Sequence, residues 1–389
     1  MALIDTSIVT LADVELWRRD LHAHPELLFD VDRTAGFVAE RLRGFGCDDV
    51  VTGIGRTGVV GLVHGHGDRD RTIALRADMD ALPITEATGL PYASTVPGHM
   101  HACGHDGHTA MLLGAVRELC VTRRFAGTVA AVFQPAEEGG GGARVMIADG
   151  LLDRFGIAEV YGMHNLPGLP IGHFAIRPGP IMAASDRFEI LVAGRGGHAA
   201  MPHLCADPVL AGAQMVVALQ TIAARNVDPL DGCVLSVTQF SAGAAQNAIP
   251  EAARLAGTAR ALRPATRAMV EERTKAIVAG VASACGVTAE VTWTRGYPAT
   301  VNDPERAAFC ADAAAEVAGR DHVDPAVEPM MGAEDFSFML AERPGAFLFP
   351  GNGDSAGLHN SAYDFNDAAL PFGIRYWVRL AERALPLGG

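Results

Sequence analysis

Positive charge is scarce in this sequence. Its 389 residues include 31 Lys and Arg but 45 Asp and Glu, which gives a net charge of −14 at pH 7. Because binding to nucleic acid or to an anionic membrane is largely electrostatic and needs basic patches, we expect neither partner. The sequence also lacks any apolar run of about 18 or more residues, and residues 1–5 show no basic segment followed by an apolar one. These absences argue against a membrane span and a secretory signal.

The sequence also lacks the cysteine spacing that is typical of disulfide-bonded proteins. The seven cysteines show no pairing pattern, and an odd number scattered through a large chain fits reduced thiols. We therefore predict a cytoplasmic location. The composition, 49% hydrophobic and 20% charged, is typical of a soluble globular protein, and the length exceeds what one ordinary core accommodates. The chain therefore predicts two domains, and we find no internal repeat or low-complexity segment.

The glycine run at 139–142 lacks the Lys-Ser or Lys-Thr that follows the glycines of a phosphate-binding loop. We interpret it as a flexible backbone stretch that passes close to a site.

Strands and helices alternate in the first part of the chain. The hydrophobic periodicity predicts strands at 59–63, 72–76, 127–133 and 157–163, and helices at 8–25, 32–45, 106–121 and 143–150. This order favours βαβ units in a largely parallel sheet, in an α/β domain. After a further helix at 303–318 and a strand at 346–350, the chain ends in a helix at 367–385.

Between these parts, the pattern changes to that of an α+β domain. Strands are expected at 186–193, 233–240, 253–262 and 287–294, with helices at 207–226 and 264–284. The order β-α-β-β-α-β is that of a ferredoxin-like sandwich. We therefore predict a metal-binding catalytic domain formed by 1–184 and 297–389, interrupted by an inserted domain at 185–296.

The segment 101–108, HACGHDGH, is the densest in metal-binding groups. Cys thiolates and His imidazoles suit borderline-soft divalent ions such as zinc, and nearby carboxylates would also accept Mn or Co. Cys103 and His105 are the first candidate ligands. Further candidates follow apolar runs or lie near the C-terminus: Glu138, His164 and His359. Because five ligands cannot comfortably share one tetrahedral ion with an open position, a site with two ions about 3.5–4 Å apart is the better hypothesis.

Glu137, beside Glu138, is the candidate general base. Adjacent side chains of an extended segment point in opposite directions, so Glu137 would reach a bridging water from the side when Glu138 faces the metal. Asp78 or Asp80, after the strand at 72–76, would orient a metal-bound His, although an Asp that caps a turn explains Asp80 equally well.

Seven motifs, in order from about residue 13 to 385, resemble the hippurate hydrolase family of N-acyl-amino-acid amidohydrolases. They are ADMDALP at 77–83, HACGHD at 101–106, QPAEE at 134–138, GMHN at 162–165, GGHAAMPH at 196–203, NAIP at 247–250 and LHN at 358–360. The resemblance implies a zinc-exopeptidase-like catalytic domain with an inserted lid that forms a homodimer, or a tetramer.

The same resemblance implies site residues and cofactors. Two divalent ions, Zn, Mn, Co or Ni, would be bound, with Cys103 as the bridge. His198 looks like the lid residue that such dimers donate to the partner's site, and Asn247 and Arg260 resemble contacts to the substrate carbonyl and carboxylate. Where the wider superfamily has a His-x-Asp motif, this chain has Arg76, Ala77 and Asp78. His105 is then the substitute ligand, and Asp78 acts through another residue.

The function predicted is hydrolysis of an N-acyl amino acid to a carboxylate and a free amino acid. A metallo-exopeptidase of the dipeptidase or carboxypeptidase type stays open as an alternative, because the same groups cleave either amide. A thiol hydrolase based on Cys103 with His105 or His108 leaves the two Glu unexplained. A binding protein on a decayed enzyme fold is opposed by the intact Glu137.

Overall fold

The computed structural model describes residues 10–67 and 70–387. The chain divides into two compact units: the larger comprises Met1–Gly179, Val301–Glu328 and Asp335–Gly389, and the smaller comprises Pro180–Thr300 and Pro329–Glu334. Among the described residues, no helix has the length and apolar character needed to cross a bilayer. Residues 1–5, on which the expectation about a signal segment rests, lie outside the described residues.

An eight-stranded sheet forms the centre of the larger unit, in the order β1-β2-β4-β3-β5-β16-β6-β15. Strands β4, β3, β5 and β16 run parallel to one another, whereas β1 and β2 are antiparallel. The strands are β1 (Asp49–Ile54), β2 (Gly58–His64), β3 (Thr72–Asp78), β4 (Thr128–Gln134), β5 (Ile157–Met163), β6 (Phe174–Ala175), β15 (Val323–Asp324) and β16 (Gly345–Pro350). Two short strands, β7 (Gly179–Met182) and β14 (Thr300–Asn302), pair separately.

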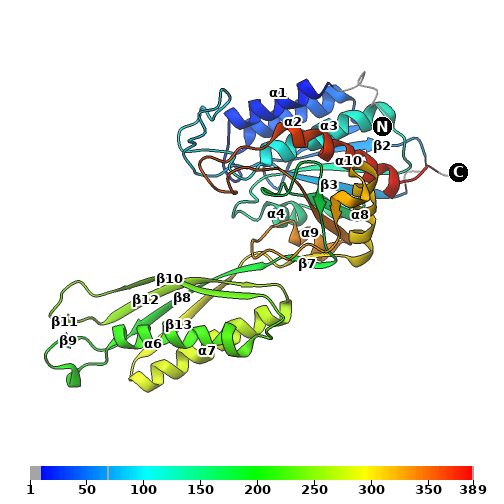
Figure 1. The fold of residues 1–389 in the computed structure, drawn as a ribbon. Helices are drawn as coiled ribbons and strands as arrows, with labels where there is room; N and C mark the ends of the chain where they lie inside the picture. Colours follow the sequence, from blue (N-terminus) through cyan, green and yellow to red (C-terminus); the bar gives the residue numbers. More distant parts are fainter. Residues whose placement is uncertain (1–9, 68–69, 388–389) are drawn as a thin grey trace. The chain divides into compact units, whose positions relative to one another are not determined.

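Helices cover both faces of this sheet. On one face α3 packs against α1, α2 and α10, and α10 also contacts α8 (Figure 1). Helices α4, α5 and α9 form a second group, in which α4 contacts β4 and α5 contacts β5. The helices are α1 (Leu11–Ala23), α2 (Asp32–Phe45), α3 (His105–Thr122), α4 (Gly142–Ala148), α5 (Leu151–Arg154), α8 (Pro304–Ala318), α9 (Ser337–Glu342) and α10 (Leu370–Ala384), with 3₁₀ turns η3 (Arg320–His322) and η4 (Asp367–Ala369).

The central strands are buried along their whole length, as parallel strands covered on both sides must be. This explains why their sequences are continuous apolar runs. Their carboxyl ends meet at one edge of the sheet, the usual place for a site in an α/β fold. Edge strand β1 was not expected, because its partly exposed sequence, DVVTGI, carries little apolar signal.

The smaller unit contains a four-stranded antiparallel sheet in the order β10-β12-β8-β13. Its elements are β8 (Ala184–Ala193), β9 (Gly197–His198), η1 (Pro202–Leu204), α6 (Pro208–Thr221), the π-helical turn η2 (Ile222–Asn226), β10 (Cys233–Ala242), β11 (Ala248–Ile249), β12 (Ala252–Ala261), α7 (Pro264–Cys285) and β13 (Thr288–Arg295). Burial alternates along β8, and the buried side chains pack with α6 and α7 in one core. The predicted element order is therefore observed.

Candidate metal centre and active site

The segment HACGHD turns sharply into helix α3 at Gly104, which has φ of 95°. A Cβ at this position would lie 2.2 Å from Oδ1 of Asn165, so only glycine fits. The turn places Cys103 just before the helix and His105 in its first turn. Glycine at this position thus serves both the backbone conformation and the close approach of the segment that follows β5.

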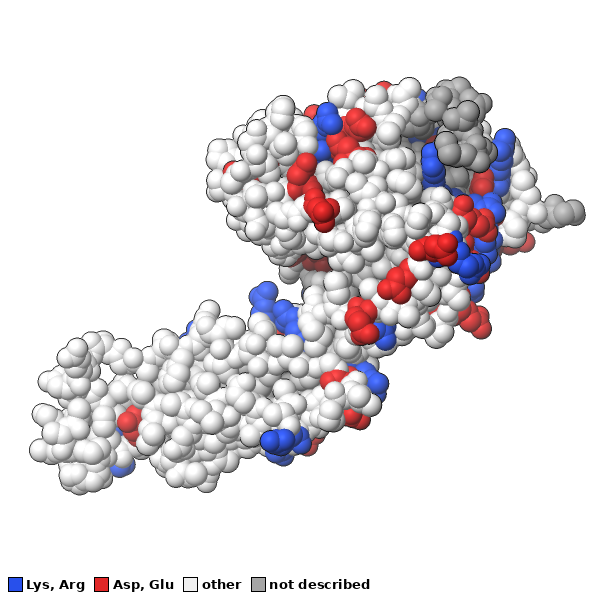
Figure 2. All heavy atoms as spheres, in the orientation of Figure 1, with Lys and Arg blue, Asp and Glu red and all other residues white. Residues whose placement is uncertain are grey.

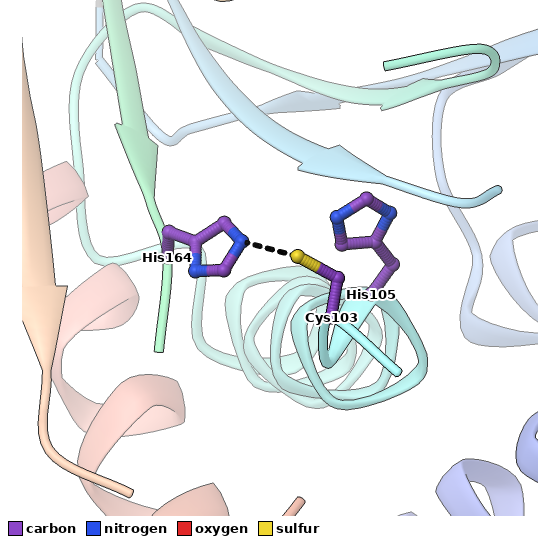
Figure 3. A group of neighbouring side chains, drawn as sticks. All are labelled: Cys103, His105 and His164. Carbon is purple, nitrogen blue, oxygen red and sulfur yellow. Dashed lines mark hydrogen bonds between the residues drawn. The ribbon is translucent and has the colours of Figure 1, made fainter. Parts of the chain in front are cut away.

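Cys103, His105 and His164 form a buried cluster next to the carboxyl ends of β3 and β5. Sγ of Cys103 lies 3.3 Å from Nε2 of His164. Figure 3 shows these two side chains pointing toward each other, with His105 alongside from the start of α3. One ligand atom from each of the three residues lies within 4.8 Å of the other two. This spacing suits one ion among them.

A second cluster shares Cys103 and adds Glu138 and His359, again with ligand atoms within 4.8 Å of one another. Nε2 of His359 lies 3.2 Å from Oε1 of Glu138. The His359 side chain is 53% exposed, whereas that of Glu138 is 11% exposed. The structure therefore brings all five predicted ligands together, with Cys103 common to both clusters and His359 on the more open side.

Glu137 and Glu138 lie in a turn, which corrects the expectation of an extended segment. Ala136 adopts a φ of 56°, and the next residues form turns. As a result, carboxylate oxygens of both Glu residues lie within 4.8 Å of each other and of a His105 ring nitrogen. The prediction that the two side chains diverge was wrong, because it assumed a strand conformation that the backbone leaves at Ala136.

Asp80 holds both Glu residues in place. Its two carboxylate oxygens accept the backbone N–H groups of Glu137 and Glu138, each at 3.0 Å, and its backbone carbonyl accepts Nδ1 of His105 at 2.7 Å. In addition, the backbone N–H of Asp335 donates to Oε1 of Glu137 at 3.3 Å. Asp80 is therefore a positioning residue. The sequence analysis left open that Asp80 caps a turn. Asp80 does cap a turn, and this turn contains Glu137 and Glu138.

Asp78 contacts His108 and Arg76 from the end of β3. Nδ1 of His108 lies 2.6 Å from Oδ1 of Asp78, and Nη1 of Arg76 donates to Oδ2 at 2.7 Å. The same oxygen, Oδ2 of Asp78, lies 3.7 Å from Nε2 of His105. The motif analysis did not assign His108 to the metal site. Its spacing of three residues from His105 on one helix face was the available signal.

The cluster carries an excess of negative groups. Burial raises the pKa of the Cys103 thiol well above its usual range, and the carboxylates of Glu138 and Glu137 raise it further. Burial lowers the pKa of His105, but Asp78 and Asp80 overcome this effect and raise it to about 10. The groups therefore hold protons when no cation is present. A bound cation would displace these protons, so metal affinity should rise with pH.

The side chains fit a divalent ion. One buried atom of the cluster, Nε2 of His105, has no hydrogen-bond partner, and Oε1 of Glu138 has only the contact with His359. Buried polar atoms are normally paired, and a cation would satisfy both. The combination of thiol, imidazole and carboxylate is also the one that zinc and its neighbours in the transition series prefer.

The three remaining candidates belong to the smaller unit. His198 and Asn247 lie close together, because the short strands β9 and β11 pair and the N–H of Ala199 donates to the carbonyl of Asn247 at 3.0 Å. Both residues are exposed. Arg260 lies on β12 and is half-buried. All three thus occupy the inserted unit, where the motifs predicted them.

Comparison with known proteins identifies the family. The family model for peptidase family M20/M25/M40 matches residues 74–383, a range that includes the whole cluster. The chain belongs to this family. Hippurate hydrolase from Campylobacter jejuni is 41% identical over 385 residues, which cover 99% of this chain and 100% of that protein. N-acetylcysteine deacetylase from Bacillus subtilis is 38% identical over 365 residues, with 94% of each chain covered.

A solved structure agrees with the M20 assignment. A dinuclear metal-binding peptidase of the M20 family from Bacillus subtilis has a TM-score of 0.86 and 35% identity, with 96% of this chain and 98% of that chain covered. The predictions of the family, of the α/β fold class and of a metal-dependent hydrolase are thereby confirmed. The M20 assignment and the ligand clusters also support the binding of divalent metal ions.

Proposed function

We propose that this M20 protein hydrolyses the amide bond of N-acyl amino acids, with Glu137 as the general base. One observation carries the proposal: the Glu137 carboxylate lies beside two candidate ligands, His105 and Glu138, while its backbone is fixed by Asp80. A base must lie within reach of the water that the site activates. The names of two relatives, a hippurate hydrolase and an N-acetylcysteine deacetylase, support this choice of amide.

Five residues would hold the two ions, and Cys103 belongs to both ligand clusters: Cys103, His105, Glu138, His164 and His359. Zn, Mn, Co and Ni all accept this ligand set. When bound, such ions lower the pKa of water and polarise the amide carbonyl.

Glu137 would take the proton from the attacking water at its carboxylate and pass it to the nitrogen of the leaving amine. General acid–base groups of this kind contribute about 10²- to 10⁴-fold in rate. The hydrogen bonds from the Asp335 N–H to the carboxylate and from the Glu137 N–H to Asp80 keep the group oriented through both transfers.

Residues of the inserted unit would complete substrate recognition. We assign His198 to stabilisation of the oxyanion, as a donor to the partner's site, Asn247 to the substrate carbonyl, and Arg260 to the substrate carboxylate. A guanidinium group binds a carboxylate through two parallel hydrogen bonds. The exposure of His198 and Asn247 leaves both available for such contacts.

A homodimer would form through helix α6 and the edge strand β10. Strand β10 is at the edge of its sheet, and neither element contains a charged residue (Figure 2). Large apolar side chains are exposed on both, including Leu210 at 55%, Val217 at 73% and Phe240 at 41%. An unpaired edge strand beside an apolar helix suits the same surface of a second copy of the chain, arranged about a two-fold axis.

The reduced state of all seven cysteines fits a cytoplasmic location for this dimer.

The test is a substrate panel with and without a chelator. Metal-reconstituted protein is incubated with N-acetyl, N-benzoyl and long-chain N-acyl amino acids beside dipeptides, and released amino acid is measured. We expect release from acyl substrates, abolished by the chelator and restored by added metal. Cleavage of dipeptides alone would favour an exopeptidase instead, and no cleavage on either panel would reject the proposal.

A further inference from the structure

One face of the sheet in the smaller unit is not covered by α6 or α7. On this uncovered face, alternate residues of β8 and β12 lie side by side. The register pairs Ser185 with Arg260 and Arg187 with Thr258. Because residues directly opposite in an antiparallel pair share a face, Arg187 and Arg260 are diagonal neighbours on it. Two guanidinium groups are thus placed next to each other in a protein with a net charge of −14.

No carboxylate of the described residues forms an ion pair with either arginine. The nearest acidic residue on the face, Glu189, forms a bidentate ion pair with Arg254, at 2.8 and 2.6 Å. Asp186 is next in sequence, but it is buried and occupied by Arg267. Among residues 10–67 and 70–387, neither Arg187 nor Arg260 has an acidic oxygen within 4.0 Å. The pair therefore has charge available for a ligand.

The environment of the pair suits a small anion. Burial lowers the pKa of Arg260, and repulsion from the adjacent Arg187 lowers it further, while the nearby Asp186 raises it only in part. A groove of about 480 Å³ on the same face is lined by Arg187, by the ion pair of Glu189 and Arg254, and by several threonines, among them Thr258, Thr292 and Thr294. Arg260 lies beside this groove and does not line it. Pockets for small molecules span about 300–1,000 Å³, which includes this volume. Arginine and threonine donors favour carboxylate oxygens.

We propose that Arg187 is a specificity residue that, beside Arg260, binds the second carboxylate of N-acyl derivatives of acidic amino acids. The inference rests on the proposed function, in which Arg260 receives the carboxylate that every N-acyl amino acid carries. The preferred substrates are then N-acyl-glutamates or N-acyl-aspartates, which bring two negative charges to two arginines. A neutral side chain would leave the Arg187 guanidinium without a counter-charge.

The kinetic test uses isosteric substrate pairs. N-acetylglutamate is compared with N-acetylglutamine, and N-acetylaspartate with N-acetylasparagine, which differ in charge but hardly in shape. We expect a higher kcat/KM for the acidic member of each pair. Arg187→Gln should lower this value for the acidic member by about 10- to 100-fold, the usual effect of losing a charge-assisted hydrogen bond. The loss should appear mainly in KM, and kcat/KM for the neutral member should hardly change.

Arg273→Gln is the control. Arg273 is an exposed arginine of α7 that does not line the groove, so its removal should leave the preference for acidic substrates unchanged. The inference is overturned if the unmodified protein shows no such preference. It is also overturned if Arg187→Gln lowers kcat/KM equally for acidic and neutral substrates.

A binding measurement separates this inference from the proposed function. Calorimetry with the Glu137→Gln protein gives Kd for N-acetylglutamate and N-acetylglutamine without turnover. A Kd ratio that favours the acidic compound and is lost in Glu137→Gln/Arg187→Gln supports the anion site, even if the unmodified protein hydrolyses neither compound. An unchanged ratio overturns the site, even if both compounds are hydrolysed.

Discussion

The metal cluster and the arginine pair solve opposite electrostatic problems. In the cluster, acidic groups and a thiol are buried together, and hydrogen bonds to Asp78 and Asp80 fix the neighbouring groups. On the uncovered sheet face, Arg187 and Arg260 are partly exposed and have no acidic oxygen within 4.0 Å in the part of the chain that the structure describes. The cluster is short of positive charge, and the arginine pair is short of negative charge.

This difference separates chemistry from recognition. Groups that take part in bond cleavage must be held in one geometry before the substrate arrives, which burial and hydrogen bonds achieve. Groups that recognise a substrate gain most when the ligand supplies their missing partner. Substitutions in the two regions should therefore have different effects. Those in the cluster should change the rate and the metal content, whereas those in the inserted unit should change substrate preference and rate but leave stability unchanged.

The largest effect is expected for Glu137→Gln. Without the carboxylate no group takes the proton from water, so kcat should fall by about 10²- to 10⁴-fold. Metal content, measured by elemental analysis of the purified protein, should stay the same because Glu137 is not among the proposed ligands. Glu138→Gln serves as the contrast, since it should lose both activity and metal. Retained activity in Glu137→Gln would contradict the role of the base.

An intermediate effect is expected for His198→Ala. The loss of an oxyanion donor typically costs about 10²- to 10³-fold in kcat. Because His198 is exposed on the short strand β9, its removal should leave the melting temperature unchanged. His203→Ala, at an exposed histidine of the same segment, should leave both kcat and the melting temperature unchanged. A lower melting temperature in His198→Ala, or an equal loss of kcat in both variants, would contradict the assignment of His198 as an exposed oxyanion donor.

The smallest effect is expected for His22, which contacts the cluster indirectly through Asp106. Nδ1 of His22 lies 2.8 Å from Oδ2 of the buried Asp106, next to His105. Burial lowers the pKa of His22, but Asp106 overcomes this and raises it from 6.5 to about 9. The protonated form is thus stabilised on folding. The contribution of His22 to the free energy of unfolding is complete below pH 6.5 and is lost as the pH rises through about 9.

The variant that tests this linkage is His22→Gln. Its deficit in unfolding free energy, measured by urea titration, should be larger at about pH 6 than at about pH 10, by up to roughly 3 kcal/mol. His24→Gln is the control, because His24 is partly exposed at the end of the same helix. A deficit that does not depend on pH would show that His22 acts through packing alone.

Much of the cluster could be predicted from the sequence. Cys103, His105, Glu138 and His164 follow apolar runs or begin a helix, and the carboxyl ends of parallel strands meet at one edge. The periodicity alone therefore places these side chains near one another. The alternation along β8 predicted the inserted sheet in the same way.

Other features depend on long-range or irregular geometry. The convergence of Glu137 and Glu138 rests on the left-handed conformation of Ala136, which is uncommon for a residue with a side chain. The proximity of Arg187 to Arg260 follows from the register between β8 and β12, which neither strand specifies by itself. The role of Asp80 depends on two N–H groups far along the chain.

The contact between His359 and Ala102 bears on how the protein is made. The His359 N–H donates to the carbonyl of Ala102 at 2.7 Å, beside Cys103. Since domains begin to fold during synthesis from the N-terminus, most ligands leave the ribosome long before His359 does. The proposed ligand set is therefore complete only once nearly the whole chain has emerged. On this proposal, full metal loading is a late step of maturation, and a product truncated before His359 lacks one of the five proposed ligands.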